Sequence, residues 1–324
     1  MTRYIIRRLI QAIPLLLLIS IVIFVLVQAT PGGPLAGHSR QKHLNPEQIA
    51  RLRKAYGLDD PLPVRYLKWL SHALRGDWGY SYQTRRPVLT EIVDRLPNTI
   101  YLMGVSFFVI MLVSIPIGII SAVRQYSLFD IVVTTVSFIG QAIPEFWFGL
   151  ILIIVFYALL SNPFTGEPLL PAGGMATLGA SFSIWDRIKH LILPVSMLTL
   201  GWLAWYSRFL RSSMLEVINM DYIRTARAKG LSERMVLYRH AFKNAAIPLV
   251  TLFALDLPSL FIGALYTEII FSWPGMGRLY YQAAVRRDYP VLMAILMIQA
   301  VLMVFANLAA DIAYGYLDPR VRYE

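Results

Sequence analysis

Long apolar runs without any charged residue dominate the chain. Four of them reach or approach the length of a membrane span: Leu9–Val27, Ile100–Val123, Leu191–Tyr206 and Val291–Ala310. An α-helix rises about 1.5 Å per residue and the hydrocarbon core of a bilayer is about 30 Å thick, so roughly twenty residues are enough to cross it. These runs therefore predict transmembrane helices.

Two further apolar segments each carry acidic residues. Ile131–Leu160 is interrupted at Pro144-Glu145, and Ile247–Phe271 holds Asp256 near its middle. The first segment is longer than a bilayer requires, so we expect it to tilt, kink or protrude into the cytosol. With these two segments, the pattern predicts an all-α polytopic membrane protein with six transmembrane helices.

The distribution of lysine and arginine predicts the orientation. Short basic loops are retained on the cytoplasmic side of a membrane. If the amino terminus lies inside, the inner pieces carry 14 basic residues in 65 positions, whereas the two short outer loops carry 5 in 49. The inner pieces are residues 1–8, 124–130, 207–246 and 315–324, and the short outer loops are 161–189 and 271–290. We therefore expect both termini to be cytoplasmic.

Composition narrows the class of protein further. The chain has 324 residues, of which 57% are hydrophobic and 15% charged, and this excludes a soluble enzyme. The net charge of +11 is spread over both sides of the predicted membrane, and no basic cluster is dense enough to indicate nucleic-acid binding. Cysteine is absent, so no disulfide holds any loop.

The segment between the first two spans predicts a small helical cap outside the membrane. Pro31-Gly32-Gly33-Pro34 ends the first helix, Asn45 to Tyr56 predicts one short helix, and Pro63 to Leu74 predicts another. The cap either packs on the outer ends of the spans or forms a docking surface for an external partner. The expected division is 1–29 for the start and first span, 30–99 for the cap, 100–314 for the five-helix core, and 315–324 for the tail.

The inner segment 207–246 is unusually long, charged and helix-forming. Between Arg208 and Lys243 it holds eight basic and three acidic residues, with apolar residues at helical spacing. Gly230 divides it, and Ser232 offers an N-cap for a following helix. We predict a helix, a sharp turn and a second helix. Two interpretations remain open: a docking site for a cytosolic protein, or a basic anchor on anionic lipid headgroups.

At these residues the chain resembles the coupling loop of binding-protein-dependent ABC importer permeases, and most closely the B-type permeases of the dipeptide, oligopeptide and nickel group. The resemblance rests on DYIRTARAKGL at 221–231, RHA at 239–241 and NAAIP at 244–248. Further matching segments follow in order along the chain: RRL at 7–9, PGGP at 31–34, YGLD at 56–59, GDWG at 76–79, RLPNT at 95–99, PEFWFGL at 144–150, WPGMG at 273–277, RDYPV at 287–291 and DPR at 318–320.

The resemblance implies one half of a pore with the type I ABC importer fold. A second homologous permease, two cytosolic ATPase subunits that carry ATP and Mg, and an external substrate-binding protein would complete the assembly in a bacterial or archaeal cell membrane. Peptides are the implied cargo. The residues expected to couple this chain to the ATPase are Asp221, Arg224, Thr225, Ala226, Lys229, Gly230 and Ser232.

Two positions depart from the wider family pattern. The general importer motif begins Glu-Ala-Ala, whereas Arg224-Thr225-Ala226 stands here, as is usual for the peptide group. Gly33 occupies a place where many relatives have aspartate, so a carboxylate role in that outer turn is not expected here.

The chain lacks the motifs of common catalytic and nucleotide sites. It contains no GxxxxGK[ST] phosphate loop, no HExxH and no GxSxG, so we expect neither enzymatic activity nor a cofactor on this chain. A charge within a span costs about 3 kcal/mol on insertion scales, so Asp256 and Glu145 should face a cavity or a partner. Each residue either lines the translocation path or makes a structural bond. Glu268 and Asp311 lie near predicted span ends, where we expect solvation.

Two other classes of protein compete with the importer subunit. A secondary transporter or channel would move its cargo without any ATPase. An intramembrane aspartyl protease would use Asp256 together with Asp311, although the GxGD context of that chemistry is absent.

Overall fold

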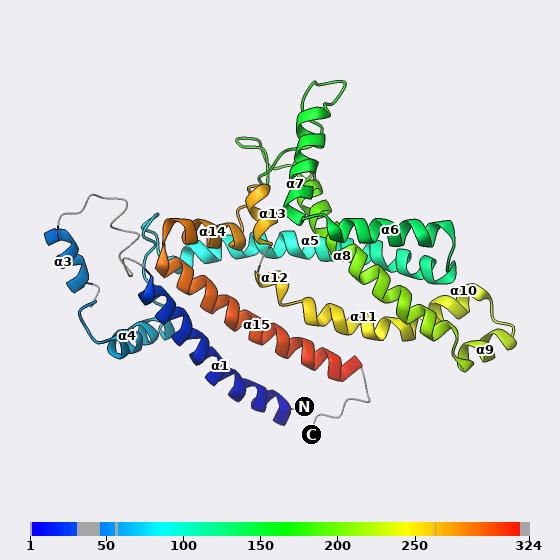
Figure 1. Ribbon diagram of the computed structural model, residues 1–324, viewed down its shortest axis with the longest axis horizontal. Helices are drawn as coiled ribbons and strands as arrows, with labels where there is room; N and C mark the ends of the chain where they lie inside the picture. Colours follow the sequence, from blue (N-terminus) through cyan, green and yellow to red (C-terminus); the bar gives the residue numbers. More distant parts are fainter. Residues whose placement is uncertain (1, 31–45, 56–57, 263, 318–324) are drawn as a thin grey trace.

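Four long helices define the shape of the molecule. The computed structural model describes residues 2–30, 46–55, 58–262 and 264–317. The long helices are α1 (Thr2–Ala29), α5 (Val88–Val123), α8 (Ile184–Ile218) and α15 (Tyr289–Leu317). Figure 1 shows an elongated bundle in which α1 runs beside α15, while α5 and α8 cross the middle of the molecule.

A sharp bend interrupts the span predicted at Ile131–Leu160. Helix α6 (Leu128–Ala142) and helix α7 (Glu145–Ile153), continued by the π-helix η2 (Ile154–Leu159), meet at an angle of 100°. The break falls at Pro144. Proline has no backbone N–H to donate to the preceding turn, and its ring takes up the space where that N–H would lie. Among the described residues, five helices are long and apolar enough to cross a membrane, and the bent pair gives a sixth when it is counted as one span.

The fifth predicted span, Ile247–Phe271, corresponds to a helical stretch with different bounds. A continuous stretch begins at Glu233 with α10 (Glu233–Met235), η3 (Val236–Phe242) and α11 (Lys243–Asp256), and it reaches Phe261 through the short α12 (Ser259–Ile262). Helix α13 (Leu265–Ile270) is separate. Pro258 cannot donate to the carbonyl four residues earlier, which accounts for a break close to Asp256.

Short helices cluster at the end of the molecule opposite α9 and α10. They are α3 (Pro46–Ala55), α4 (Leu62–Leu74) and α14 (Met276–Arg286). The aromatic rings of Tyr66 and Trp69 on α4 pack against Phe24 of α1, and the Tyr66 hydroxyl lies 2.8 Å from Ser20 Oγ. Both helices predicted between the first two spans are therefore present, and α4 rests on α1 through its aromatic face. Helix α5 begins inside the segment expected to form the cap.

The largest buried cluster joins α5 and α8 to the elements around α9. At Gly118 a side chain would meet Leu210 Cβ and the Ser207 carbonyl at 2.9 Å, so the two helices touch backbone to backbone. Fully buried residues continue this contact toward α9 (Asp221–Ala228). They are Tyr206, Leu210, Met214, Ile223, Val236, Ala241 and Ala245. The helix α8 thus links the middle of the bundle to the charged end.

Candidate functional site

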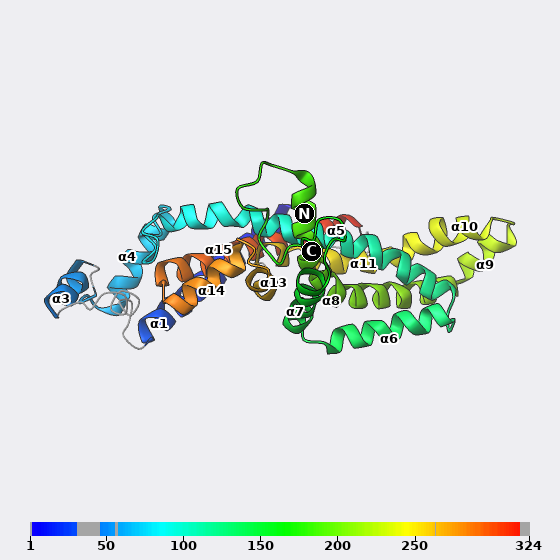
Figure 2. The same ribbon diagram turned by 90° about the horizontal axis from the view of Figure 1, so that it is seen from above.

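The charged segment forms a helical hairpin at the tip of the molecule. After α8 ends at Ile218, α9 lies at the far tip of the molecule, and the chain reverses in the turn before α10, which begins at Glu233 (Figure 2). The outer face of α9 is polar and exposed: the side chain of Asp221 is 95% exposed and that of Arg224 is 72% exposed. Thr225 and Lys229 are also exposed. The predicted helix, turn and helix are present, and the outer face of α9 is polar and exposed.

The inner face of α9 is apolar and holds the hairpin against the bundle. Ile223 is fully buried and Ala226 is 6% exposed, one helical turn apart on the same side. Ala226 was expected among the residues that contact an ATPase. In the structure Ala226 lies on this inner face, within the buried cluster, where α9 packs on η3.

A glycine in the left-handed region makes the turn of the hairpin. Gly230 has φ +77°, and a Cβ built there would meet no atom within 4 Å, so the constraint is conformational and not steric. Arg227 Nη2 donates to Glu233 Oε1 at 2.7 Å across the turn. This hydrogen bond raises the pKa of the Arg227 guanidinium. Ser232 occupies the N-cap position as predicted, but its side chain makes no capping hydrogen bond.

Two arginines of α8 hold it to α6. Arg211 binds the Asp130 carboxylate with two hydrogen bonds of 2.7 Å, and the Asp130 side chain is only 4% exposed. One turn earlier, Arg208 Nη2 donates to Gln141 Oε1 at 3.1 Å, and its guanidinium lies 4.8 Å from the centre of the Phe138 ring. Nothing in the sequence pattern indicated these pairs, because they join residues 67 and 81 positions apart.

A cavity of about 400 Å³ opens at the bend between α6 and α7. It is lined by Gly140, Gln141, Ile143, Pro144, Glu145, Phe148, Met197, Leu198, Leu200, Gly201 and Trp202. Gln141 therefore belongs both to the cavity and to the contact with Arg208. Glu145, expected on the translocation path or in a structural bond, lies on the cavity wall at the start of α7.

The carboxylate of Asp256 is held by a phenol. Tyr206 Oη donates to Asp256 Oδ2 at 2.5 Å, and the Tyr206 ring stacks on Trp202 at 6.2 Å between ring centres. This bond matches the structural interpretation of Asp256. The other proposed member of a protease pair, Asp311, lies 3.2 Å from Arg8 Nη2. The two carboxylates have different partners, as expected of separate structural roles.

Glu268 was expected to be solvated near a span end, and the structure corrects this. Glu268 is fully buried, because α13 is a separate helix that turns the side chain inward. Glu268 Oε1 accepts from the Thr99 hydroxyl at 2.8 Å, and Oε2 accepts from the Arg278 N–H at 2.9 Å. The Thr99 hydroxyl oxygen also accepts from the Met276 N–H at 2.7 Å. The sequence segments RLPNT and WPGMG thus meet around one buried carboxylate.

Gly275→Ala is expected to destabilise this junction. A Cβ at Gly275 would lie 2.5 Å from both Glu268 Oε2 and Thr99 Oγ1, and overpacking of this kind costs about 1–3 kcal/mol. Thermal unfolding of the detergent-solubilised protein should therefore shift to lower temperature. Gly104→Ala is the matched control, since a Cβ there meets nothing within 4 Å. Equal unfolding temperatures for the two variants would contradict the expectation.

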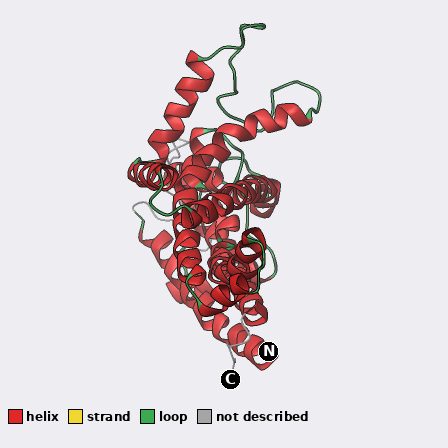
Figure 3. Cartoon of the chain, turned by 90° about the vertical axis from the view of Figure 1, so that its right-hand side faces the viewer, coloured by secondary structure: helices red, strands yellow, loops and turns green. Residues whose placement is uncertain are grey.

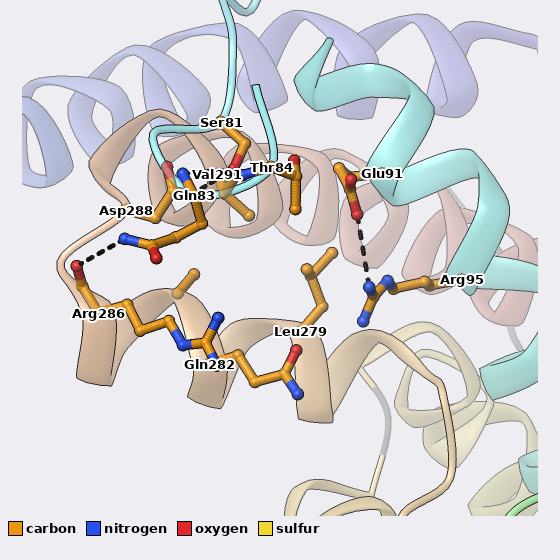
Figure 4. Close-up of a pocket in the computed structure, with 11 residues that line it drawn as sticks. Ser81, Gln83, Thr84, Glu91, Arg95, Leu279, Gln282, Arg286, Asp288 and Val291 are labelled. Atoms are coloured by element: carbon orange, nitrogen blue, oxygen red, sulfur yellow. Dashed lines mark hydrogen bonds and ion pairs between the residues drawn. The ribbon is translucent and has the colours of Figure 1, made fainter. Parts of the chain in front are cut away.

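At the end of the molecule opposite the hairpin, the loop before α5 is bound to the start of α15. Asp288 accepts from Ser81 Oγ at 2.5 Å and from the Tyr82 N–H at 3.1 Å. Figure 4 shows the small pocket beside this contact, where the Gln83 side chain reaches the Arg286 carbonyl. The pocket has a volume of only about 40 Å³, so it has room for water and not for a solute. We assign this region to structural support.

Comparison with known proteins identifies the family. Residues 1–103 match the N-terminal model of the binding-protein-dependent transport system membrane components, and residues 114–323 match the model of their inner membrane component. The chain is 47% identical to the oligopeptide transport system permease protein AppB of Bacillus subtilis (strain 168), and the match covers all of both chains. It is 37% identical to the dipeptide transport system permease protein DppB of Escherichia coli (strain K12), again over all of both chains.

One solved structure supports the fold. A chain of the MetNI methionine ABC transporter, in an inward-facing conformation, superposes with a TM-score of 0.55 at 17% sequence identity. The superposition covers 71% of this chain and 97% of that one. The described residues form helices joined by loops and contain no strand, as Figure 3 shows. The chain belongs to the family of binding-protein-dependent transport system inner membrane components, and it is a multi-pass permease subunit of an ABC importer.

Proposed function

We propose that this permease forms one half of a pore that imports peptides. The two relatives described above are named as an oligopeptide and a dipeptide permease, and both match this chain over their full length. A second, homologous permease would supply the other half, and an external substrate-binding protein would deliver the peptide. The helices α3 and α4 lie at the end opposite the hairpin, where such a protein would dock.

The hairpin around α9 is the proposed contact with the ATPase. An exposed polar face over an apolar inner face allows one helix to bind a partner and still move with the bundle. Asp221, Arg224, Thr225 and Lys229 would make the contact, and Gly230 with Ser232 would form the pivot. ATP and Mg would be bound by two separate cytosolic subunits, so ATP hydrolysis would not take place on this chain. In this proposal both termini and the hairpin lie in the cytosol.

The observation that carries the proposal is the hairpin, because an ordinary loop between spans would need no ordered helix held by buried residues. The test is reconstitution in vesicles. The complete assembly of two permeases, ATPase subunits and binding protein should accumulate peptide only when ATP is supplied on the hairpin side. Peptide uptake by vesicles that hold this chain alone would instead support an ATP-independent transporter, and ATP-driven uptake of a different solute only would overturn the peptide assignment.

A further inference from the structure

The broken span creates a cavity whose walls are suited to a cation. Figure 1 shows α7 standing nearly upright on the end of α6, and the cavity of about 400 Å³ lies at this corner. In hydrocarbon, interrupted helix backbone is tolerated only where it is buried in protein or lines a cavity. A bend of 100° inside a predicted span is therefore expected to face a space that holds water or cargo.

The backbone at the corner adds partial negative charge. Pro144 has no N–H, so it cannot satisfy the carbonyl of Gly140 as a continuing helix would. The last carbonyls of α6 form the negative end of its helix dipole. Gly140 and Gln141 at this helix end line the cavity. These groups would stabilise a positive charge close to them.

A carboxylate without a basic partner lies on the same wall. In the described part of the chain no basic side chain pairs with Glu145, and the polar group beside it is the neutral hydroxyl of Thr267. Arg208, which contacts the cavity residue Gln141, is already engaged by that amide, the Ala204 carbonyl and the Phe138 ring. The charge of Glu145 therefore calls for a cation that the chain itself does not supply.

Two aromatic side chains complete the wall. Phe148 and Trp202 both line the cavity, and aromatic faces attract ammonium groups. The Trp202 ring is held by stacking on Tyr206, whose hydroxyl binds Asp256. Asp256 thus acts through Tyr206 to fix the position of Trp202. A cation at this wall would meet a rigid surface.

We propose that this cavity is a transient binding site for the free ammonium group of the imported peptide, with Glu145 as its counter-charge. This inference rests on the proposed function, because it assigns a place on the path to one part of that cargo. Glu145 is a specificity-determining residue in this proposal. A basic residue of the second permease is the competing occupant of the cavity.

The absence of cysteine from the chain allows a test by chemical modification. The full assembly is reconstituted with Glu145→Gln, Glu145→Asp and Glu145→Cys. Loss of a charged hydrogen-bond partner should lower the rate of peptide uptake about tenfold in Glu145→Gln, and Glu145→Asp should retain most of it. Treatment of Glu145→Cys with a negatively charged methanethiosulfonate should restore uptake, whereas a positively charged reagent of similar size should not.

Controls separate this proposal from the proposed function. Glu167→Cys, in an exposed outer loop, should show wild-type uptake before and after either reagent. Uptake of peptide by the unmodified wild-type assembly verifies the proposed function independently. Wild-type uptake in Glu145→Gln, or equal effects of both reagents, would overturn the ammonium site. Loss of co-purification of the two permeases in Glu145→Gln would also overturn it, in favour of a contact between subunits.

Discussion

Gly230→Val is expected to uncouple ATP hydrolysis from transport, whereas Gly230→Asn should remain close to wild type. The backbone at this position has φ +77°, where a β-branched residue is strongly disfavoured and asparagine is tolerated. The left-handed conformation costs about 1–2 kcal/mol for an ordinary L-residue, which corresponds to a change of roughly 5- to 30-fold in the population of the native turn. Neither side chain would meet another atom within 4 Å of its Cβ.

The measurement compares two rates in the same vesicles. Peptide uptake per ATP hydrolysed should fall about tenfold in Gly230→Val, while the amount of inserted protein and the basal ATP hydrolysis stay unchanged. The comparison with asparagine shows whether backbone conformation is responsible, because both substitutions add a side chain of moderate size at an exposed position. A normal coupling ratio in Gly230→Val would contradict the assignment of the hairpin as the coupling element.

Asp130→Asn alone is expected to reduce stability and transport more than the double variant that carries Asp130→Asn and Arg211→Gln. The Asp130 side chain is 4% exposed and accepts both guanidinium bonds of Arg211. Removing one partner of a fully buried pair costs about 3–5 kcal/mol, because the remaining charge is left without compensation, whereas replacing both partners costs much less. The Arg211 side chain is 24% exposed, so the cost of Asp130→Asn should be smaller than this. The same carboxylate accepts from the Tyr126 N–H at 2.9 Å, so the start of α6 depends on it as well.

This prediction is checked by thermal unfolding and by transport in Asp130→Asn, in Arg211→Gln and in the double variant. The single variants should unfold at lower temperature and lose uptake, and the double variant should recover part of both. Lys68→Gln serves as the control for loss of an exposed ion pair, since its partner is Asp60 at the surface and such pairs contribute about 1 kcal/mol or less. Additive effects of the two single substitutions would show that the pair does not connect α6 to α8.

Features that depend on neighbours in sequence could be predicted. The bend at Pro144 follows from the missing N–H, and the hairpin follows from helical spacing on both sides of Gly230. In both cases the chemistry of one or two adjacent residues determines the local backbone. The external helices were predicted from start and stop signals for the same reason.

Features that depend on distant partners could not be predicted. Glu268 is buried because Thr99 and the Arg278 N–H satisfy it, and neither is adjacent to it in the sequence. The contact between Asp130 and Arg211 joins two helices whose register is set by packing. The burial of Ala226 could not be predicted either, since small residues occur on both faces of α9 and only the packing of the folded chain shows which face is inner.

The helix that returns from the hairpin contains seven residues of π-helix, from Val236 to Phe242. A π-turn holds one residue more than an α-turn, so the chain before Val236 is displaced by one residue from where an unbroken α-helix would place it. One residue corresponds to a rotation of about 100° and a rise of about 1.5 Å. Because α9 packs on this π-helical segment, deleting one residue from it is expected to shift the surface that α9 rests on, without changing any side chain of α9.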